Sequence, residues 1–180
     1  MVREVLSGAQ IKGRTLITMP SNVLTELLRG KGAHVDPLAC VEDISAELAE
    51  RSVEGFPHSI ADLVFHMNYW MNYELKRIRG EKPQYPEHNA ESFPSTPQNW
   101  DQMRRDLSWF LGEFARLAQS RREVLETQVE SIHPGDKQQS STREALLWQI
   151  VAHNSYHGGQ IAMLRQALGA WPPKAGGDTW

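Results

Sequence analysis

The chain has 180 residues, of which 40% are hydrophobic and 23% are charged, a composition typical of a globular protein with one substantial core. Its formal net charge is −3 and it contains no long basic run. This argues against a protein that binds duplex DNA, because that class needs a concentrated positive face. We therefore expect a single domain over residues 1–180 and no nucleic-acid partner.

The sequence also indicates a cellular location. Its one cysteine, Cys40, excludes an intramolecular disulfide and fits a reducing compartment. The first residues lack the apolar segment of a signal peptide, and no apolar run is long enough to span a bilayer. These features predict a cytoplasmic protein with no membrane-spanning segment.

The first third of the chain predicts two helices. Residues 1–20 show no clear periodicity. A short helix follows Ser21 and ends at Gly30, because glycine readily adopts the left-handed conformation that closes a helix. Asp36, which precedes a proline, then resembles an N-cap, and apolar residues at helical spacing continue to Leu48.

Longer helices are predicted further along. Ser59 begins a helix that ends at Gly80, and a polar loop with several prolines follows it over residues 81–96. This loop is longer than most connections in a bundle, so we expect it to lie near the open end of the bundle. Thr96, which also precedes a proline, begins the third of the four longer helices, and this helix fades around Gln128.

The last predicted helix begins at the capping-box pattern of residues 141–144 and ends at Gly169. The tail over residues 171–180 is expected to be irregular. No strand alternation, repeat or low-complexity tract occurs. The pattern predicts an all-α fold, a four-helix bundle with the long loop between its second and third helices.

Two histidines on the last predicted helix occupy positions that call for apolar residues. The apolar stripe of this helix passes through Ile150 and Ile161, and His153 and His157 lie between them at steps of three and four. Residues four apart share one helix face, about 40° around and about 6 Å along the axis. Burying imidazoles without partners costs free energy, so something inside the bundle should satisfy them, and one metal ion can bind both.

A third histidine, His66, lies on an apolar stripe of the helix that begins at Ser59. With His153 and His157 it would form a set of three ligands that leaves a coordination position open. Neutral imidazoles suit Zn²⁺, Ni²⁺, Cu²⁺ or Fe²⁺ and do not suit Ca²⁺ or Mg²⁺. In the alternative, each histidine bonds to a carbonyl or to water at the edge of the core.

The spacing of the pair is not that of the zinc proteases, in which glutamate directly follows the first histidine as general base. The corresponding residue here is Asn154, which cannot accept a proton. Three neutral ligands would leave the charge of a dication uncompensated, so an anionic fourth ligand is favoured. A bound thiol would lose its proton without a protein base, and the set therefore suits a thiol co-substrate.

Other residues near these positions have simpler interpretations. His58 suits a surface or capping role better than a hydrogen bond to a metal ligand. Asp62 either caps its helix or orients the ring of His66. Gln160 lies one turn after His157, where it can bond to a ligand or to the groups that surround the metal ligands. Cys40 is expected to be buried or half-buried rather than a nucleophile.

Three histidines in predicted loops are expected to be solvated: His34, His88 and His133. Two adjacent glycines, Gly158 and Gly159, lie inside the last helix, where each costs roughly 1 kcal/mol relative to alanine. Close approach of another helix would justify this cost.

A longer motif surrounds the paired histidines, namely His153-Asn154-x-Tyr156-His157-x-Gly159-Gln160-Ile161, continued by Leu164-Arg165-Gln166 and Gly169-x-Trp171-Pro172-Pro173. His66 followed by Trp70, and Phe93-Pro94 ahead of Trp100, accompany it. Over residues 20–173 the chain resembles the DinB/YfiT-like family.

The resemblance implies a four-helix bundle that binds a divalent metal, often zinc or nickel, on His66, His153 and His157. It also implies homodimers. Members of the family are described as metal-dependent hydrolases, as transferases of low-molecular-weight thiols or as isomerases with a thiol cofactor. Gly158 departs from the pattern, because a bulkier residue is expected there, and the change would alter packing beside the metal.

Two functional hypotheses follow. In the first, the protein is an enzyme whose metal activates a small thiol or water for S-transfer to, or hydrolysis of, a small-molecule substrate, and no acid or base is assigned. In the second, the metal ties two helices together in a non-catalytic stress or binding protein.

Overall fold

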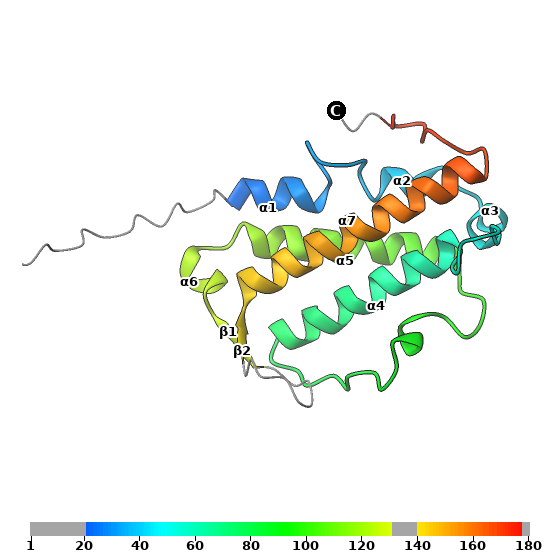
Figure 1. Ribbon diagram of the computed structural model, residues 1–180. Helices are drawn as coiled ribbons and strands as arrows, with labels where there is room; N and C mark the ends of the chain where they lie inside the picture. Colours follow the sequence, from blue (N-terminus) through cyan, green and yellow to red (C-terminus); the bar gives the residue numbers. More distant parts are fainter. Residues whose placement is uncertain (1–20, 131–139, 178–180) are drawn as a thin grey trace, which may run out of the picture.

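Figure 1 shows the computed structural model, which describes residues 21–130 and 140–177. Its long helices are α4 (Ile60–Ile78), α5 (Trp100–Ala118) and α7 (Arg143–Ala167). The shorter helical segments are α1 (Ser21–Leu28), α2 (Ala39–Glu42), α3 (Ala46–Glu50), the 3₁₀ turn η1 (Asn89–Ser92) and α6 (Arg122–Leu125). Two short strands, β1 (Gln128–Glu130) and β2 (Ser140–Thr142), pair antiparallel. The fold is therefore mostly helical, as predicted.

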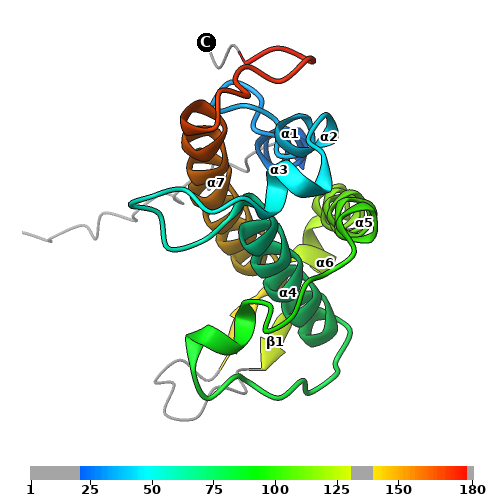
Figure 2. The same ribbon diagram turned by 90° about the vertical axis from the view of Figure 1, so that its right-hand side faces the viewer.

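The core lies between helices that are distant in the sequence. α4 contacts both α5 and α7, and α1 contacts the same two helices from the opposite side of the core (Figure 2). The largest fully buried side chains include Leu28, Ile60, Met67, Met71, Leu107, Phe114, Leu147 and Ile161. None of the described helices combines the length and the apolar character needed to cross a bilayer.

The capping residues fix where the histidine-bearing helices begin and end. Ser59 Oγ accepts from the backbone N–H of Asp62, and the Asp62 carboxylate accepts from the N–H of Ser59, so the predicted capping box is present. Gly80 and Gly169 follow the ends of α4 and α7 with φ of +82° and +69°, a conformation that favours glycine. These boundaries agree with the sequence prediction.

Two predicted helix boundaries are wrong. The single helix expected from Asp36 to Leu48 is divided into α2 and α3, because Ser45 caps α3 and Asp43 turns away to bind Arg165. The helix expected at Thr96 begins at Trp100, because the side chain of Asn99 accepts from the N–H of Gln102 and caps it.

The region that follows α5 also differs from the prediction. α5 ends at Ala118 instead of continuing towards Gln128, and the chain turns into α6. Two strands were not predicted, because three residues are too few to show an alternating pattern. Thr142 rather than Ser141 caps α7, with its hydroxyl accepting from the N–H of Ala145.

The long loop over residues 81–96 runs back along α4. The Tyr85 ring packs against Trp70 and Tyr73 of α4, with ring centroids 5.7 and 5.8 Å apart. Further along, η1 and Phe93 lie against His66. The loop therefore reaches the histidine face of α4.

A buried ion pair joins the end of α7 to the segment between α2 and α3. The Arg165 guanidinium donates to the Asp43 carboxylate at 2.7 Å and to the carbonyl oxygens of Cys40 and Ala170. Asp43 also accepts from the backbone N–H of Lys174, so one pair anchors both α7 and the C-terminal segment. The Arg165 hydrogen bond lowers the pKa of Asp43, which keeps the pair charged at neutral pH.

Replacing Arg165 with leucine should therefore lower the free energy of unfolding by about 3 kcal/mol or more, because the Asp43 carboxylate would lose its partner. Arg51→Ala breaks an exposed ion pair with Glu47 and should cost about 0.5 kcal/mol or less. Urea denaturation of both variants measures the difference. Equal losses would show that the buried pair does not hold α7 in place.

Candidate metal centre

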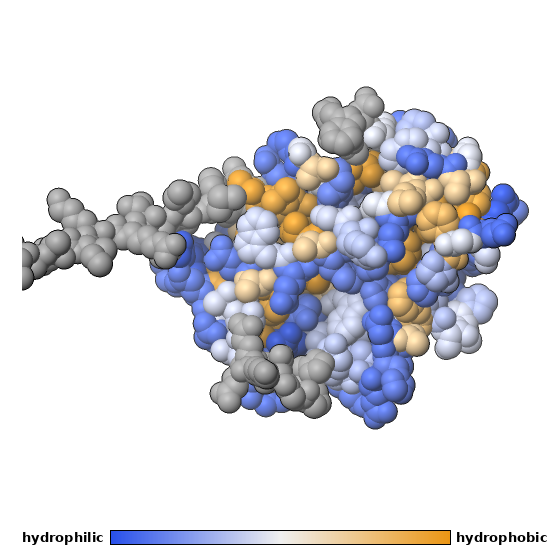
Figure 3. All heavy atoms as spheres, in the orientation of Figure 1, coloured by the Kyte–Doolittle hydropathy of each residue, from blue (hydrophilic) through white to orange (hydrophobic). Residues whose placement is uncertain are grey.

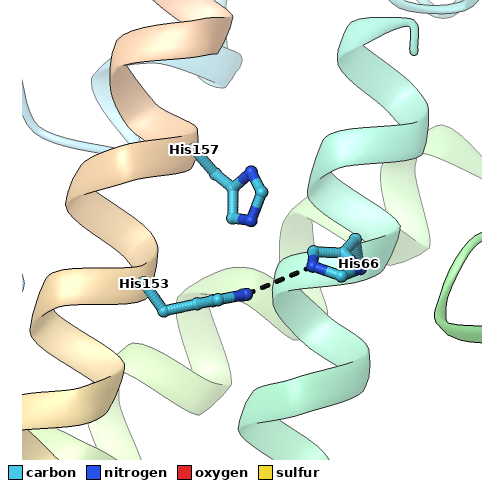
Figure 4. A group of neighbouring side chains, drawn as sticks. All are labelled: His66, His153 and His157. Atoms are coloured by element: carbon cyan, nitrogen blue, oxygen red, sulfur yellow. Dashed lines mark hydrogen bonds between the residues drawn. The ribbon is translucent and has the colours of Figure 1, made fainter. Parts of the chain in front are cut away.

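Three imidazoles meet between α4 and α7. His66 projects from α4, and His153 and His157 project from successive turns of α7 towards it (Figure 4). The Nε2 atoms of His66 and His153 are 3.2 Å apart, and one ring nitrogen from each of the three histidines lies within 4.8 Å of the others. His66 and His157 are buried and His153 is half-buried. The structure thus brings the three predicted ligands together.

A serine fixes the proton on His66. The hydroxyl of Ser92 donates to the Asn89 carbonyl oxygen at 2.6 Å, because a carbonyl can only accept. Its lone pair is then available to accept from Nδ1–H of His66 at 2.8 Å. With the proton on Nδ1, neutral His66 directs the lone pair of Nε2 at the other two imidazoles.

A glutamine does the same for His157. Gln160 Oε1 lies 2.6 Å from His157 Nδ1 and accepts a hydrogen bond from its N–H, so the proton stays on Nδ1 and the Nε2 lone pair is free. Gln160 therefore binds a candidate metal ligand. His153 has a weaker partner, since its Nδ1 is 3.4 Å from the side-chain oxygen of Asn154.

The surroundings keep the three rings uncharged. Burial, together with the neighbouring His157 and His153, lowers the pKa of His66 to about 4. Burial and the adjacent His157 also lower the pKa of His153 to about 4, and burial lowers that of His157. At neutral pH the cluster therefore offers unprotonated nitrogens, the form that binds a metal.

These residues fit a divalent metal. Two nitrogens at tetrahedral positions around zinc lie about 3.3 Å apart, since each Zn–N bond is about 2.0–2.1 Å. The observed separation of 3.2 Å between His66 and His153 matches that spacing. Nitrogen lone pairs that face one another inside a protein need a cation or a shared proton between them. Three imidazoles without a carboxylate suit zinc, nickel, copper or iron.

Aromatic rings close one side of the cluster. Phe93 stacks on the His66 ring with centroids 4.3 Å apart, and His58 stacks on the other face of Phe93 at 3.9 Å. Trp70 lies edge-on to His66 at 6.3 Å. His58 is thus a half-buried stacking residue.

The structure decides the open question about Asp62 and confirms the prediction for Cys40. Asp62 caps α4, and none of its hydrogen bonds reaches His66. Cys40 is buried, and burial raises the pKa of its thiol to about 12, so it is not a nucleophile.

The three histidines in predicted loops differ in how they compare with the prediction that they are solvated. His88 is exposed as predicted, and His133 lies outside the described residues. The prediction that His34 is solvated is wrong. Its Nδ1–H donates to the Val35 carbonyl at 2.8 Å, and its Nε2 accepts from the hydroxyl of Ser155 at 2.7 Å. It therefore ties the segment after α1 to α7.

The two helix glycines do not meet a neighbouring helix of the described chain. A Cβ at Gly158 would lie 3.9 Å from the His34 ring, an ordinary contact, and one at Gly159 would meet nothing within 4 Å. Close approach of another helix in the described part of the chain is therefore not the reason for these glycines.

Sequence reasoning missed Ser92, the partner of His66. It lies 26 residues further along, in a loop without periodicity, so no spacing rule connects the two. The only signal was the length of the loop, because loops of that length often cover or line a site.

The residues of the candidate metal centre lie in a part of the chain that matches the model of a protein family. A model of the DinB family matches residues 24–178, which is most of the chain. The chain belongs to the DinB family. All three histidines, Ser92 and Gln160 lie inside the matched range. A comparison with curated proteins gives no significant match.

In this DinB-family chain, Ser92→Ala should weaken binding of Zn²⁺ or Ni²⁺ about 10-fold, because His66 loses the acceptor that fixes its tautomer. A chelator competition assay measures the dissociation constant. Ser95→Ala, at an exposed position of the same loop, is the matched control and should leave affinity unchanged. Equal affinities in all three proteins would contradict the role of Ser92.

The metal-free protein should lose stability as the pH falls from 6.5 towards 4. In this window the unfolded chain binds protons that the folded state excludes from His66 and His153. The free energy of unfolding therefore decreases as the pH falls. The expected loss between pH 7 and pH 5 is about 1–2 kcal/mol per histidine. Urea titrations at several pH values test this, and His153→Gln should flatten the dependence.

Proposed function

We propose that this protein is a metal-dependent enzyme in which His66, His153 and His157 hold a divalent ion, zinc or nickel, and that a small thiol or water is the activated co-substrate. The observation that carries the proposal is the convergence of the three ring nitrogens, two of them oriented by Ser92 and Gln160. When bound there, a dication with only neutral protein ligands would lower the pKa of a thiol or of water.

Among the described residues, the cluster favours a thiol over water. No carboxylate joins the three histidines in this part of the chain. Asn154, at the position of the zinc-protease base, is buried and donates its amide to the sulfur of Met71. Water attack needs a residue to accept a proton, whereas a thiol that binds as its anion does not.

The remaining residues of the cluster would orient and shield the reacting groups. Phe93 covers one face of His66 and excludes water from that side. Gln160 and Ser92 hold the outer nitrogens and so keep the inner nitrogens unprotonated. We propose conjugation as the reaction class, in which the intact thiolate forms a bond through its sulfur to a small electrophilic substrate after its proton is released to solvent, with hydrolysis as the second reaction that the same site would support.

We also propose a domain organisation, a cellular location and an oligomeric state for the protein. The whole chain would form one domain, with α1, α4, α5 and α7 as a four-helix bundle and residues 81–96 as the long loop between its second and third helices. It would act as a cytoplasmic homodimer on a small-molecule substrate.

The enzyme proposal predicts that protein loaded with Zn²⁺ or Ni²⁺ conjugates a small thiol to an electrophile. His157→Ala should reduce this activity on the order of 100-fold or more, because a metal ligand is lost. The assay uses several low-molecular-weight thiols with the metal-loaded protein. His88→Asn removes an exposed imidazole, keeps a residue suited to precede the η1 turn, and should retain full activity.

Equal activity of His157→Ala and wild type would reject a catalytic metal. A metal that raises the melting temperature by several degrees while no thiol or hydrolysable substrate turns over would instead favour the non-catalytic alternative, in which the ion only joins α4 to α7.

A further inference from the structure

One face of α7 is not used by the core or by the histidines. It carries five exposed residues at steps of four, four, three and four, here called the α7 seam: Trp148, Ala152, Tyr156, Gly159 and Met163. At about 100° per residue, the seam spans about 80° of the helix circumference. The buried stripe through Ile150 and Ile161 lies on the opposite side of the helix.

The α7 seam carries large hydrophobic side chains that are exposed to solvent. Trp148, Tyr156 and Met163 are 38%, 66% and 56% exposed, and in the described chain only Trp109 on α5 is comparable among the large hydrophobic residues. The Arg79 guanidinium covers the Trp109 ring at 5.8 Å, and no such cation covers the seam in the described residues. The space-filling view shows the mixture of polar and apolar surface on the side drawn in Figure 1 (Figure 3). A helix with apolar residues on both faces is expected to be covered on both.

The charge pattern identifies the kind of partner. α7 has no charged residue from Ala145 to Leu164, although 23% of the chain is charged. Burying the seam therefore desolvates no charge, and two copies of it meet without repulsion. When two such helices pair antiparallel, the positive end of each helix dipole lies beside the negative end of the other, which is favourable.

Gly159 gives an independent indication. Glycine weakens a helix relative to alanine, yet a Cβ at this position would meet nothing in the described chain. The missing side chain becomes useful only when another backbone approaches from outside.

The order of side-chain sizes is symmetric about Tyr156. Bulky Trp148 and Met163 lie at the two ends of the seam, and small Ala152 and Gly159 lie between them and Tyr156. Antiparallel pairing about a two-fold axis beside Tyr156 would place Trp148 of one copy on Met163 of the other, a contact of sulfur with an aromatic ring. It would also place Ala152 opposite Gly159, where the backbones can approach.

We propose that the α7 seam is the surface through which two copies of this chain form a two-fold dimer. The inference rests on the homodimer of the proposed function and specifies its interface. A dimer of this kind is isologous, so the same patch serves both copies, as the symmetric seam allows.

The seam also borders the candidate metal centre. The Tyr156 hydroxyl accepts from the amide of Gln160 at 3.4 Å, and Gln160 accepts from His157. The ring of Tyr156 lies 5.1 Å from that of His157. A second copy on the seam would therefore shield the hydrogen bonds that orient one candidate ligand.

Sedimentation velocity of the full chain tests the proposal. Wild type should sediment with twice the chain mass of 20.4 kDa at micromolar concentration. Met163→Lys and Trp148→Glu should each yield monomers, because a charge would be buried in the seam. Mixing the two variants should restore a dimer, since the lysine of one copy then faces the glutamate of the other. Trp109→Glu, an exposed aromatic residue off the seam, is the matched control and should remain dimeric.

Circular dichroism checks that the exposed substitutions leave the helices folded. A wild-type monomer would overturn both the homodimer and the seam. A dimer that survives both seam variants would overturn the seam and leave the homodimer standing, and mixed variants that stay monomeric would overturn the antiparallel pairing. Zn²⁺ titration of the same proteins reports on the metal proposal separately.

Discussion

Burying three imidazoles between α4 and α7 costs free energy unless their ring nitrogens have partners. The structure supplies these partners from outside the two helices and from within α7. Ser92 bonds His66 from the loop, and Gln160 bonds His157 from the next turn. The inner nitrogens are then left facing one another, and this arrangement is the reason the cluster suits a cation.

The loop over residues 81–96 shows how a segment without regular structure becomes part of a site. Tyr85 anchors its first half on α4, and Phe93 anchors its second half on His66. Between these anchors, η1 holds the Ser92 hydroxyl within reach of the histidine. The aromatic contacts therefore position a hydrogen bond that decides the tautomer of a candidate metal ligand.

α7 has three kinds of surface along one helix. Its buried stripe fills the core, its histidines face α4, and its uncharged outer face remains exposed. Arg165 fixes the end of the helix by binding Asp43 and two carbonyl groups. Two hydrogen bonds, from Gln160 to Tyr156 and from His157 to Gln160, connect the outer face to a candidate ligand.

The sequence alone determined what depends on neighbouring residues. Spacing placed His153 and His157 on one helix face, and local patterns identified the Ser59 cap and the glycine ends of α4 and α7. Tertiary structure decided what depends on distant partners, because no local pattern records a contact made 26 or 121 residues away. Such contacts join Ser92 to His66 and His34 to Ser155. The helix start at Asn99 depends on which of several side chains binds the free backbone N–H groups. The break between α2 and α3 depends on a distant arginine, Arg165, which binds Asp43.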